Sequence, residues 1–148
     1  MEKKAVKSAW LIVDLVNDFV TGKFGSEKGI QVAERTAEIL EDLEGKITVI
    51  FTLDTHVPGD PEFSVWGEHC LIGTDGSRLY PKLKGMKGYS ITKRHYDAFL
   101  GTDLDLYLRC VQPHIFQVRE KSSSLQSTKL LIIICINQDS STFCQGSN

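Results

Sequence analysis

Two nearly continuous apolar runs, residues 9–15 and 47–53, dominate the hydrophobic pattern in the first third of the chain. Runs of this length without alternation are typical of strands buried on both faces of a sheet. Between them, residues 26–44 place apolar side chains at helical intervals, with Ser26 as a candidate cap and Gly45 as the stop. Strand, helix and strand in this order predict a parallel α/β unit with a right-handed crossover.

The next part of the chain is less regular. Residues 54–88 contain three of the four prolines and predict a long loop, which its aromatic and leucine side chains indicate is packed and not disordered. A short strand over residues 89–93 follows. A helix then begins near Thr102, where the sequence T-D-L-D suits a capping box. Together these elements predict an α/β fold with a doubly wound parallel sheet, in a single domain over residues 1–148.

Composition narrows the classes of partner. The chain is 41% hydrophobic and 24% charged, with a formal net charge of −2, which gives no electrostatic reason to expect nucleic acid or an anionic membrane. Asp14 interrupts the first apolar run, so we expect neither a signal peptide nor a membrane helix. The four cysteines lack the spacing of a disulfide framework. These features predict a soluble, cytoplasmic protein.

Charged side chains stand at the ends of the three predicted strands. Asp14 lies near the end of the first, Asp54 just past the second and Lys93 just past the third. The carboxyl ends of parallel strands share one edge of a sheet, where ligands bind in folds of this class. Polar residues are common at strand ends for structural reasons alone, but three charged residues in this order favour a functional site.

Four segments in order carry a resemblance to a known family: V-D-L-V-N-D-F (13–19), D-T-H (54–56), W-G-E-H-C-L-I-G-T-D-G (66–76) and the segment K-R-H-Y-D-A-F-L-G-T-D-L-D-L-Y-L-R (93–109). Residues 8–109 thus resemble the isochorismatase-like cysteine hydrolases, and nicotinamidases most closely within them. The resemblance implies a doubly wound parallel sheet, a small-molecule amide substrate and, because the family is commonly oligomeric, a homo-oligomer.

The resemblance also implies an Asp–Lys–Cys triad, in which Asp14 and Lys93 match the first two members. A neighbouring ammonium lowers the pKa of a thiol, and a carboxylate can take the thiol proton and pass it to the leaving ammonia. The implied reaction converts nicotinamide and water to nicotinate and ammonia.

Asp54 and His56 have i, i+2 spacing, which directs both side chains to one side of an extended segment, and His69 follows thirteen residues later. One carboxylate with two imidazoles suits Zn, Mn or Fe, and zinc is the ion we expect. In nicotinamidases the matching residues hold a metal that receives the pyridine nitrogen of the substrate. Glu62 stands where some members supply a further ligand, and Asp60 is an alternative.

Aromatic residues provide candidate contacts for a flat substrate. Phe19 and Trp66 match residues that flank the substrate ring in the family, although either could instead belong to the core. Cys70 is expected to be a small buried residue, and His95 to lie at the surface or behind the site.

The resemblance stops after Arg109. Residues 110–148 contain one glycine and no alanine, against eleven and five in residues 1–109, and lack the family segment that carries the nucleophile. We expect an out-of-frame or alternatively spliced end, with a divergent end as the alternative. Cys135 follows the predicted strand K-L-L-I-I-I and is the best nucleophile candidate, although it could be an inert strand cysteine. Cys110 and Cys144 suit the role less well.

Three functions therefore remain open. The leading one is a metal-assisted cysteine amidohydrolase of nicotinamidase type. A second is another cysteine hydrolase of the superfamily, acting on a different small amide or on isochorismate; the metal residues argue against isochorismate. The third is a catalytically dead metal-binding form that lacks the nucleophile.

Overall fold

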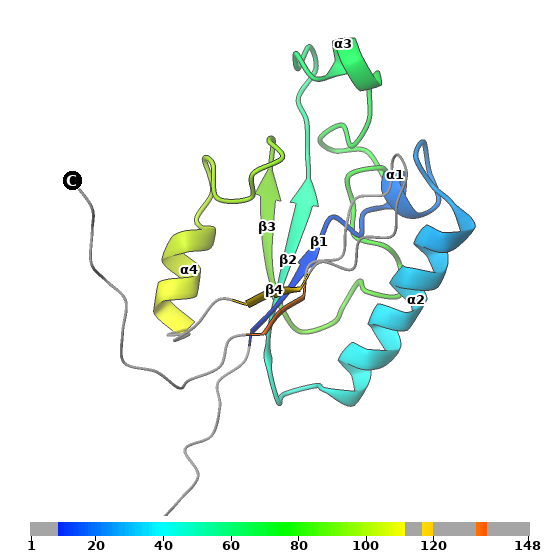
Figure 1. Cartoon of the computed structure of the whole chain (residues 1–148). Helices are drawn as coiled ribbons and strands as arrows, with labels where there is room; N and C mark the ends of the chain where they lie inside the picture. The colour runs from blue at the N-terminus through cyan, green and yellow to red at the C-terminus, as the bar shows by residue number, and fades with distance from the viewer. Residues whose placement is uncertain (1–8, 112–116, 120–132, 136–148) are drawn as a thin grey trace, which may run out of the picture.

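The computed structural model describes residues 9–111, 117–119 and 133–135. A three-stranded parallel sheet lies at its centre, in the order β1 (Ala9–Val13), β2 (Thr48–Asp54) and β3 (Tyr89–Lys93). Helices α2 (Glu27–Asp42) and α4 (Leu104–Val111) lie on opposite sides of this sheet (Figure 1). The predicted α/β class with helices on both faces is confirmed, and β3 has the predicted bounds.

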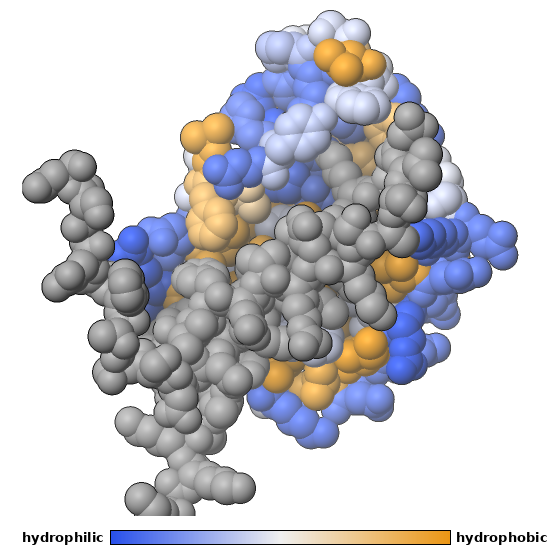
Figure 2. Space-filling view, viewed as in Figure 1, coloured by the Kyte–Doolittle hydropathy of each residue, from blue (hydrophilic) through white to orange (hydrophobic). Residues whose placement is uncertain are grey.

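Ser26 caps helix α2 as predicted, and the helix ends at Asp42, two residues before the predicted end. The Ser26 side chain accepts a hydrogen bond from the backbone N–H of Gly29 at 3.0 Å, and Gly45 adopts a left-handed φ of 72° just beyond the last turn. The inner face of α2 is buried through Ala33, Ala37 and Leu40, while its outer surface is hydrophilic (Figure 2). This amphipathic pattern holds α2 against the sheet.

Two apolar clusters cover the two faces of the sheet. One joins α2 to Ile12 and Phe51, and the other joins Leu104 of α4 to Ile50 and Ile91. Ile50 and Phe51 are neighbours in β2 and point to opposite faces, so one central strand contributes to both clusters. The sheet is therefore buried on both sides, as the continuous apolar runs predicted.

Replacing Ser26 by alanine is expected to lower the free energy of unfolding by about 1 kcal/mol, because the N–H of Gly29 loses its side-chain acceptor. Urea denaturation followed by circular dichroism measures this loss. Ser26→Asp is the matched control, since a carboxylate can also cap a helix. An equal loss in both variants would contradict the capping role.

Two short helices were not predicted: α1 (Asn17–Val20) and α3 (Phe63–Trp66). The long loop over residues 54–88 contains α3 and is packed, as expected. Isolated β-bridges pair His56 with Leu71 and Val16 with Leu79, which ties this loop to the sheet. Four-residue helices fixed by such distant contacts leave no helical period in the sequence.

The remaining strands, β4 (Gln117–Arg119) and β5 (Ile133–Cys135), pair antiparallel. Strand β5 lies beside β1 and ends at Cys135 (Figure 1). The predicted strand before Cys135 is thus found in part, whereas Cys144 lies outside the described residues. In the part of the chain that the structure describes, no helix has the length and apolar character needed to cross a membrane.

Candidate active site

The three charged strand ends meet at the carboxyl edge of the sheet. Lys93, the last residue of β3, pairs in register with Asp54, the last residue of β2. Its ammonium Nζ lies 2.8 Å from Asp14 Oδ2 and 3.2 Å from Asp54 Oδ1. All three side chains are 2% exposed. The convergence expected from the strand order is therefore present.

The environment of Lys93 favours its charged form. Burial disfavours the ammonium charge, but the attraction of Asp14 and Asp54 and the hydrogen bonds to both outweigh it, so the pKa of Lys93 is raised. Asp14 is fixed from a second side by Thr52, whose hydroxyl donates to Oδ1 at 3.1 Å. Asp14 also has a φ of 55°, a left-handed conformation that is costly for a residue other than glycine and ends β1 at Val13.

A buried cluster of metal-ligating residues adjoins this pair. One ligand atom each from Asp54, His56 and His69 lies within 4.8 Å of the others. Asp54 Oδ2 is 3.2 Å from His56 Nε2 and 3.6 Å from His69 Nε2. Asp54 therefore contacts Lys93 through one oxygen and both imidazoles through the other. One carboxylate and two imidazoles form a donor set that fits Zn, Mn or Fe.

The two acidic residues left open as a further ligand occupy different positions. Glu62 approaches the ligand atoms, with Oε2 3.9 Å from His56 Nε2 and Oε1 3.9 Å from His69 Nε2. Asp60 instead lies on the opposite edge of the His56 ring, 3.0 Å from Nδ1. It also accepts from the Val57 N–H at 3.1 Å and pairs with Arg94. The geometry thus favours Glu62, and the hydrogen bond from Arg94 holds the pKa of Asp60 at about 2.

Both histidines have an acceptor at Nδ1. His56 Nδ1 faces Asp60 at 3.0 Å, and His69 Nδ1 lies 2.8 Å from the carbonyl oxygen of Gly67. An imidazole that donates from Nδ1 keeps the lone pair of Nε2 free for a ligand. Both rings therefore present Nε2 toward Asp54 and Glu62.

A carboxylate of helix α1 accepts a hydrogen bond from the loop that carries His69 and fixes that loop. The Cys70 N–H donates to Asp18 Oδ2 at 2.7 Å, and Cys70 has a left-handed φ of 44°. Gly76 permits this contact, since a Cβ there would lie 2.2 Å from the same carboxylate oxygen. Cys70 is buried, as predicted, and His95 is exposed.

Aromatic rings surround the imidazoles. Phe19 and Phe24 lie 5.9 and 5.1 Å from the His69 ring, and Phe63 lies 5.3 Å from the His56 ring. Trp66 is 46% exposed and donates its indole N–H to the Tyr96 hydroxyl at 2.7 Å. The alternative that Trp66 belongs to the core is therefore excluded, and the Trp66–Tyr96 pair lies at the surface.

Sequence reasoning missed four of these neighbours: Thr52, Phe24, Arg94 and Tyr96. Thr52 lies within an apolar strand, and Phe24 lies in a loop beyond the motif. Arg94 directly follows Lys93, and its charge beside the predicted edge of the sheet was an available signal. Tyr96 contacts Trp66 across thirty positions of sequence, which no local pattern reveals.

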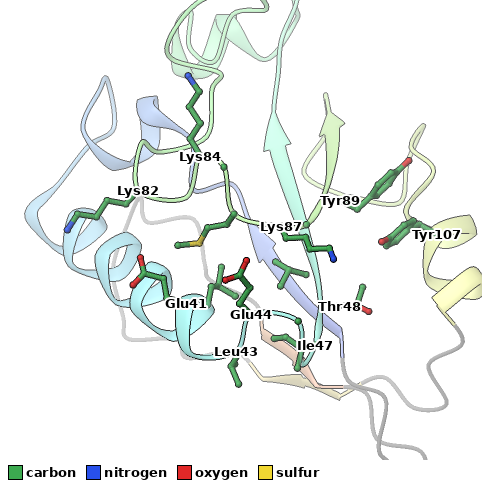
Figure 3. Close-up of a pocket in the computed structure, with 16 residues that line it drawn as sticks. Glu41, Leu43, Glu44, Ile47, Thr48, Lys82, Lys84, Lys87, Tyr89 and Tyr107 are labelled. Carbon is green, nitrogen blue, oxygen red and sulfur yellow. The ribbon is translucent and has the colours of Figure 1, made fainter.

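A separate cavity of about 660 Å³ lies at the amino ends of the strands (Figure 3). Its lining includes Ile47, Met86, Tyr89 and Tyr107, with glutamates from the end of α2 and the turn after it and lysines from the loop before β3. None of the residues at the carboxyl edge contributes to it. The candidate active site and this cavity are therefore distinct.

A parallel α/β sheet with buried charged and metal-ligating groups at its carboxyl edge defines an α/β protein with an enzyme-like site. The model of the isochorismatase domain matches residues 8–112. The chain belongs to the isochorismatase family.

Among its relatives, a Bacillus subtilis protein described as the uncharacterized isochorismatase family protein PncA is 33% identical over 119 residues, which are 70% of this chain and 65% of the relative. Nicotinamidase 1 of Arabidopsis thaliana is 32% identical over 62% of this chain and 41% of its own length. The chain therefore covers less than two thirds of the length of either.

Solved structures share the fold. N-carbamoylsarcosine amidase from Thermoplasma acidophilum matches with a TM-score of 0.65 and 32% identity, over 70% of this chain and 61% of that one. Pyrazinamidase of Pyrococcus horikoshii, solved in complex with zinc, matches with a TM-score of 0.61 and 25% identity, over 69% and 63%.

Proposed function

We propose that this chain is a metal-assisted cysteine amidohydrolase of nicotinamidase type, which converts nicotinamide and water to nicotinate and ammonia. The observation that carries the proposal is a buried cluster in which Lys93 contacts both Asp14 and Asp54. Asp54 also belongs to the possible metal-ligand set with two histidines. The similarity to a nicotinamidase and to a pyrazinamidase supports the same class of substrate.

In the proposed reaction the thiol of Cys135 gives its proton to Asp14, and its sulfur attacks the amide carbon. The carbon–nitrogen bond breaks, the proton passes to the leaving nitrogen, and ammonia departs from a thioester. Water then attacks the thioester carbon and the carbon–sulfur bond breaks; one water proton restores the thiol, the other passes to solvent, and nicotinate is released. Lys93 stabilises the thiolate through its ammonium charge. Cys135 is the proposed nucleophile because it ends β5, the strand that lies beside β1.

Asp54, His56 and His69 would hold the metal, with Glu62 as the proposed further ligand. Their burial, the Nδ1 acceptors of both histidines and the orientation of both Nε2 atoms toward Asp54 support this assignment. Zinc is the preferred ion, with manganese or iron as alternatives. When bound, the metal would supply a Lewis acid for the pyridine nitrogen of the substrate.

The proposed ring contacts are Phe19, which lies beside His69, and Trp66, the exposed last residue of α3. Flat apolar faces on either side of the substrate would favour an aromatic ring over an aliphatic amide. Phe24 adds a third ring, edge-on to His69.

A second candidate is hydrolysis of a carbamoyl compound, which the similarity to N-carbamoylsarcosine amidase favours. A carbamoyl substrate has no pyridine nitrogen. Competition between nicotinamide and N-carbamoylsarcosine for the same protein would therefore separate the two candidates.

The test is ammonia release from nicotinamide by the whole 148-residue chain, loaded with zinc. We expect release above background that is lost in Asp14→Asn and in Cys135→Ala, whereas Cys110→Ala retains it. Cys110 is an exposed cysteine on α4 and serves as the matched control. A folded, zinc-loaded chain without release from either amide would contradict the proposal and favour the catalytically dead form.

A further inference from the structure

The ring of His56 lies between two carboxylates that face its two nitrogens. Asp54 Oδ2 is 3.2 Å from Nε2, and Asp60 Oδ2 is 3.0 Å from Nδ1. Each carboxylate can accept a hydrogen bond from the nitrogen that it faces, and a neutral ring has only one N–H, so the two carboxylates favour opposite tautomers. Only the tautomer with hydrogen on Nδ1 leaves Nε2 free to bind a metal.

Each of these carboxylates has its own cation, and the two cations are consecutive residues. Lys93 at the end of β3 contacts Asp54 Oδ1, and Arg94 contacts Asp60 Oδ1. Lys93 is buried, whereas the side chain of Arg94 is 52% exposed. The end of β3 therefore fixes the acceptors on both sides of His56.

The contacts of Asp60 leave its carboxylate little freedom. Oδ2 faces His56 Nδ1 and accepts from the Val57 N–H, while Oδ1 accepts from Arg94. Its backbone carbonyl accepts from the N–H of Phe63 at 3.0 Å, at the start of α3. Without Arg94, Oδ1 would lose its charged partner, and rotation of the carboxylate would weaken the contact with Nδ1.

We propose that Arg94 is a positioning residue for the metal site, which acts through Asp60 to hold His56 with hydrogen on Nδ1 and Nε2 free. This inference rests on the proposed metal site. Carboxylates behind a ligating histidine orient the ring and raise its basicity, and their loss typically weakens metal binding by about 10–100-fold. Asp60, paired with Arg94, faces Nδ1 and not Nε2, so it supports a ligand without being one.

The first test is zinc affinity, measured by competition with a chromophoric chelator. We expect Arg94→Gln to weaken binding about tenfold, the lower end of the range for such outer partners, and Arg94→Lys to restore part of the loss. Arg35→Gln is the matched control, because Arg35 forms an exposed ion pair with Glu38. Unchanged affinity in Arg94→Gln would overturn the inference.

A double-mutant cycle tests whether Arg94 acts through Asp60. Asp60→Asn keeps an oxygen for His56 and Val57 but removes the charge that Arg94 holds. We expect Arg94→Gln to have almost no further effect on zinc affinity in that background. Losses that multiply in the double variant would show that Arg94 acts by another route and would overturn the inference.

The tautomer of His56 gives a readout that needs no metal. Nitrogen-15 spectra of the metal-free protein, at a pH where imidazoles are neutral, should show hydrogen on Nδ1 in the wild type. In Arg94→Gln the tautomer with hydrogen on Nε2 should gain population, since Asp54 still faces that nitrogen. Identical tautomers would overturn the inference, whereas a wild type that binds no zinc but shows this shift would contradict only the proposed metal site.

Discussion

Replacing Lys93 by methionine is expected to lower the free energy of unfolding by about 3–5 kcal/mol, the usual cost of removing one partner from a buried ion pair. Methionine fills a similar length but brings no charge, so Asp14 and Asp54 would face each other without a cation. Both side chains are 2% exposed, and water cannot replace the ammonium group there without opening the edge of the sheet. Urea denaturation measures the loss.

The matched control is Lys82→Met. Lys82 also contacts a carboxylate, Glu34, but its side chain is 60% exposed. Exposed pairs contribute about 0–1 kcal/mol, so this variant should be nearly neutral. A loss for Lys93→Met no larger than that for Lys82→Met would contradict the role assigned to burial. Adding Asp14→Asn to Lys93→Met should recover part of the loss, since one of the two opposed charges is then removed.

The stability loss and the catalytic loss are separable in this design. Lys93→Met should lose ammonia release at temperatures where circular dichroism still reports a folded chain, because the proposed thiolate has lost its cation. Asp14→Asn should also lose release, yet with Lys93 still paired to Asp54 it should unfold at a higher urea concentration than Lys93→Met.

The parts of the fold that the sequence predicted are those set by burial. Strands β1 and β2 are buried on both faces and therefore read as continuous apolar runs, and α2 shows one apolar face. Once the strands were placed, the parallel order put Asp14, Asp54 and Lys93 on one edge. The first approximation of the site therefore followed from hydrophobic patterning and the polarity of the chain alone.

The parts that were not predicted depend on hydrogen bonds between distant segments. Asp60 and Glu62 both precede His69 in an irregular loop, and spacing alone could not decide which carboxylate approaches the ligand atoms. In the structure the Asp60 N–H donates to the Val57 carbonyl oxygen, and the Asp60 side chain turns back to His56 Nδ1, which favours Glu62 as the proposed ligand. The charge of Arg94 beside Lys93 was visible in the sequence, but its pairing with Asp60 was not, because that partner is thirty-four residues away.

Replacing His69 by alanine is expected to weaken zinc binding by about 100-fold or more. Apparent binding free energies of about 10–16 kcal/mol for four-ligand zinc sites correspond to roughly 3 kcal/mol for each ligand, or two orders of magnitude in affinity. His56→Ala should lose a similar amount, because both imidazoles direct Nε2 toward Asp54. Isothermal titration or chelator competition measures the loss, and His95→Ala, at an exposed position, is the control.

The same variants test what the metal contributes to the proposed reaction. If it receives the substrate ring, His56→Ala and His69→Ala should raise KM for nicotinamide sharply, since a contact made in both the ground state and the transition state has been removed. Cys135→Ala should instead abolish turnover while zinc affinity stays at the wild-type value, because the nucleophile is not a proposed ligand. Unchanged kinetics in both histidine variants would exclude the proposed metal role. Zinc affinity and turnover that fall together in Cys135→Ala would place that cysteine in the metal site and require a different nucleophile.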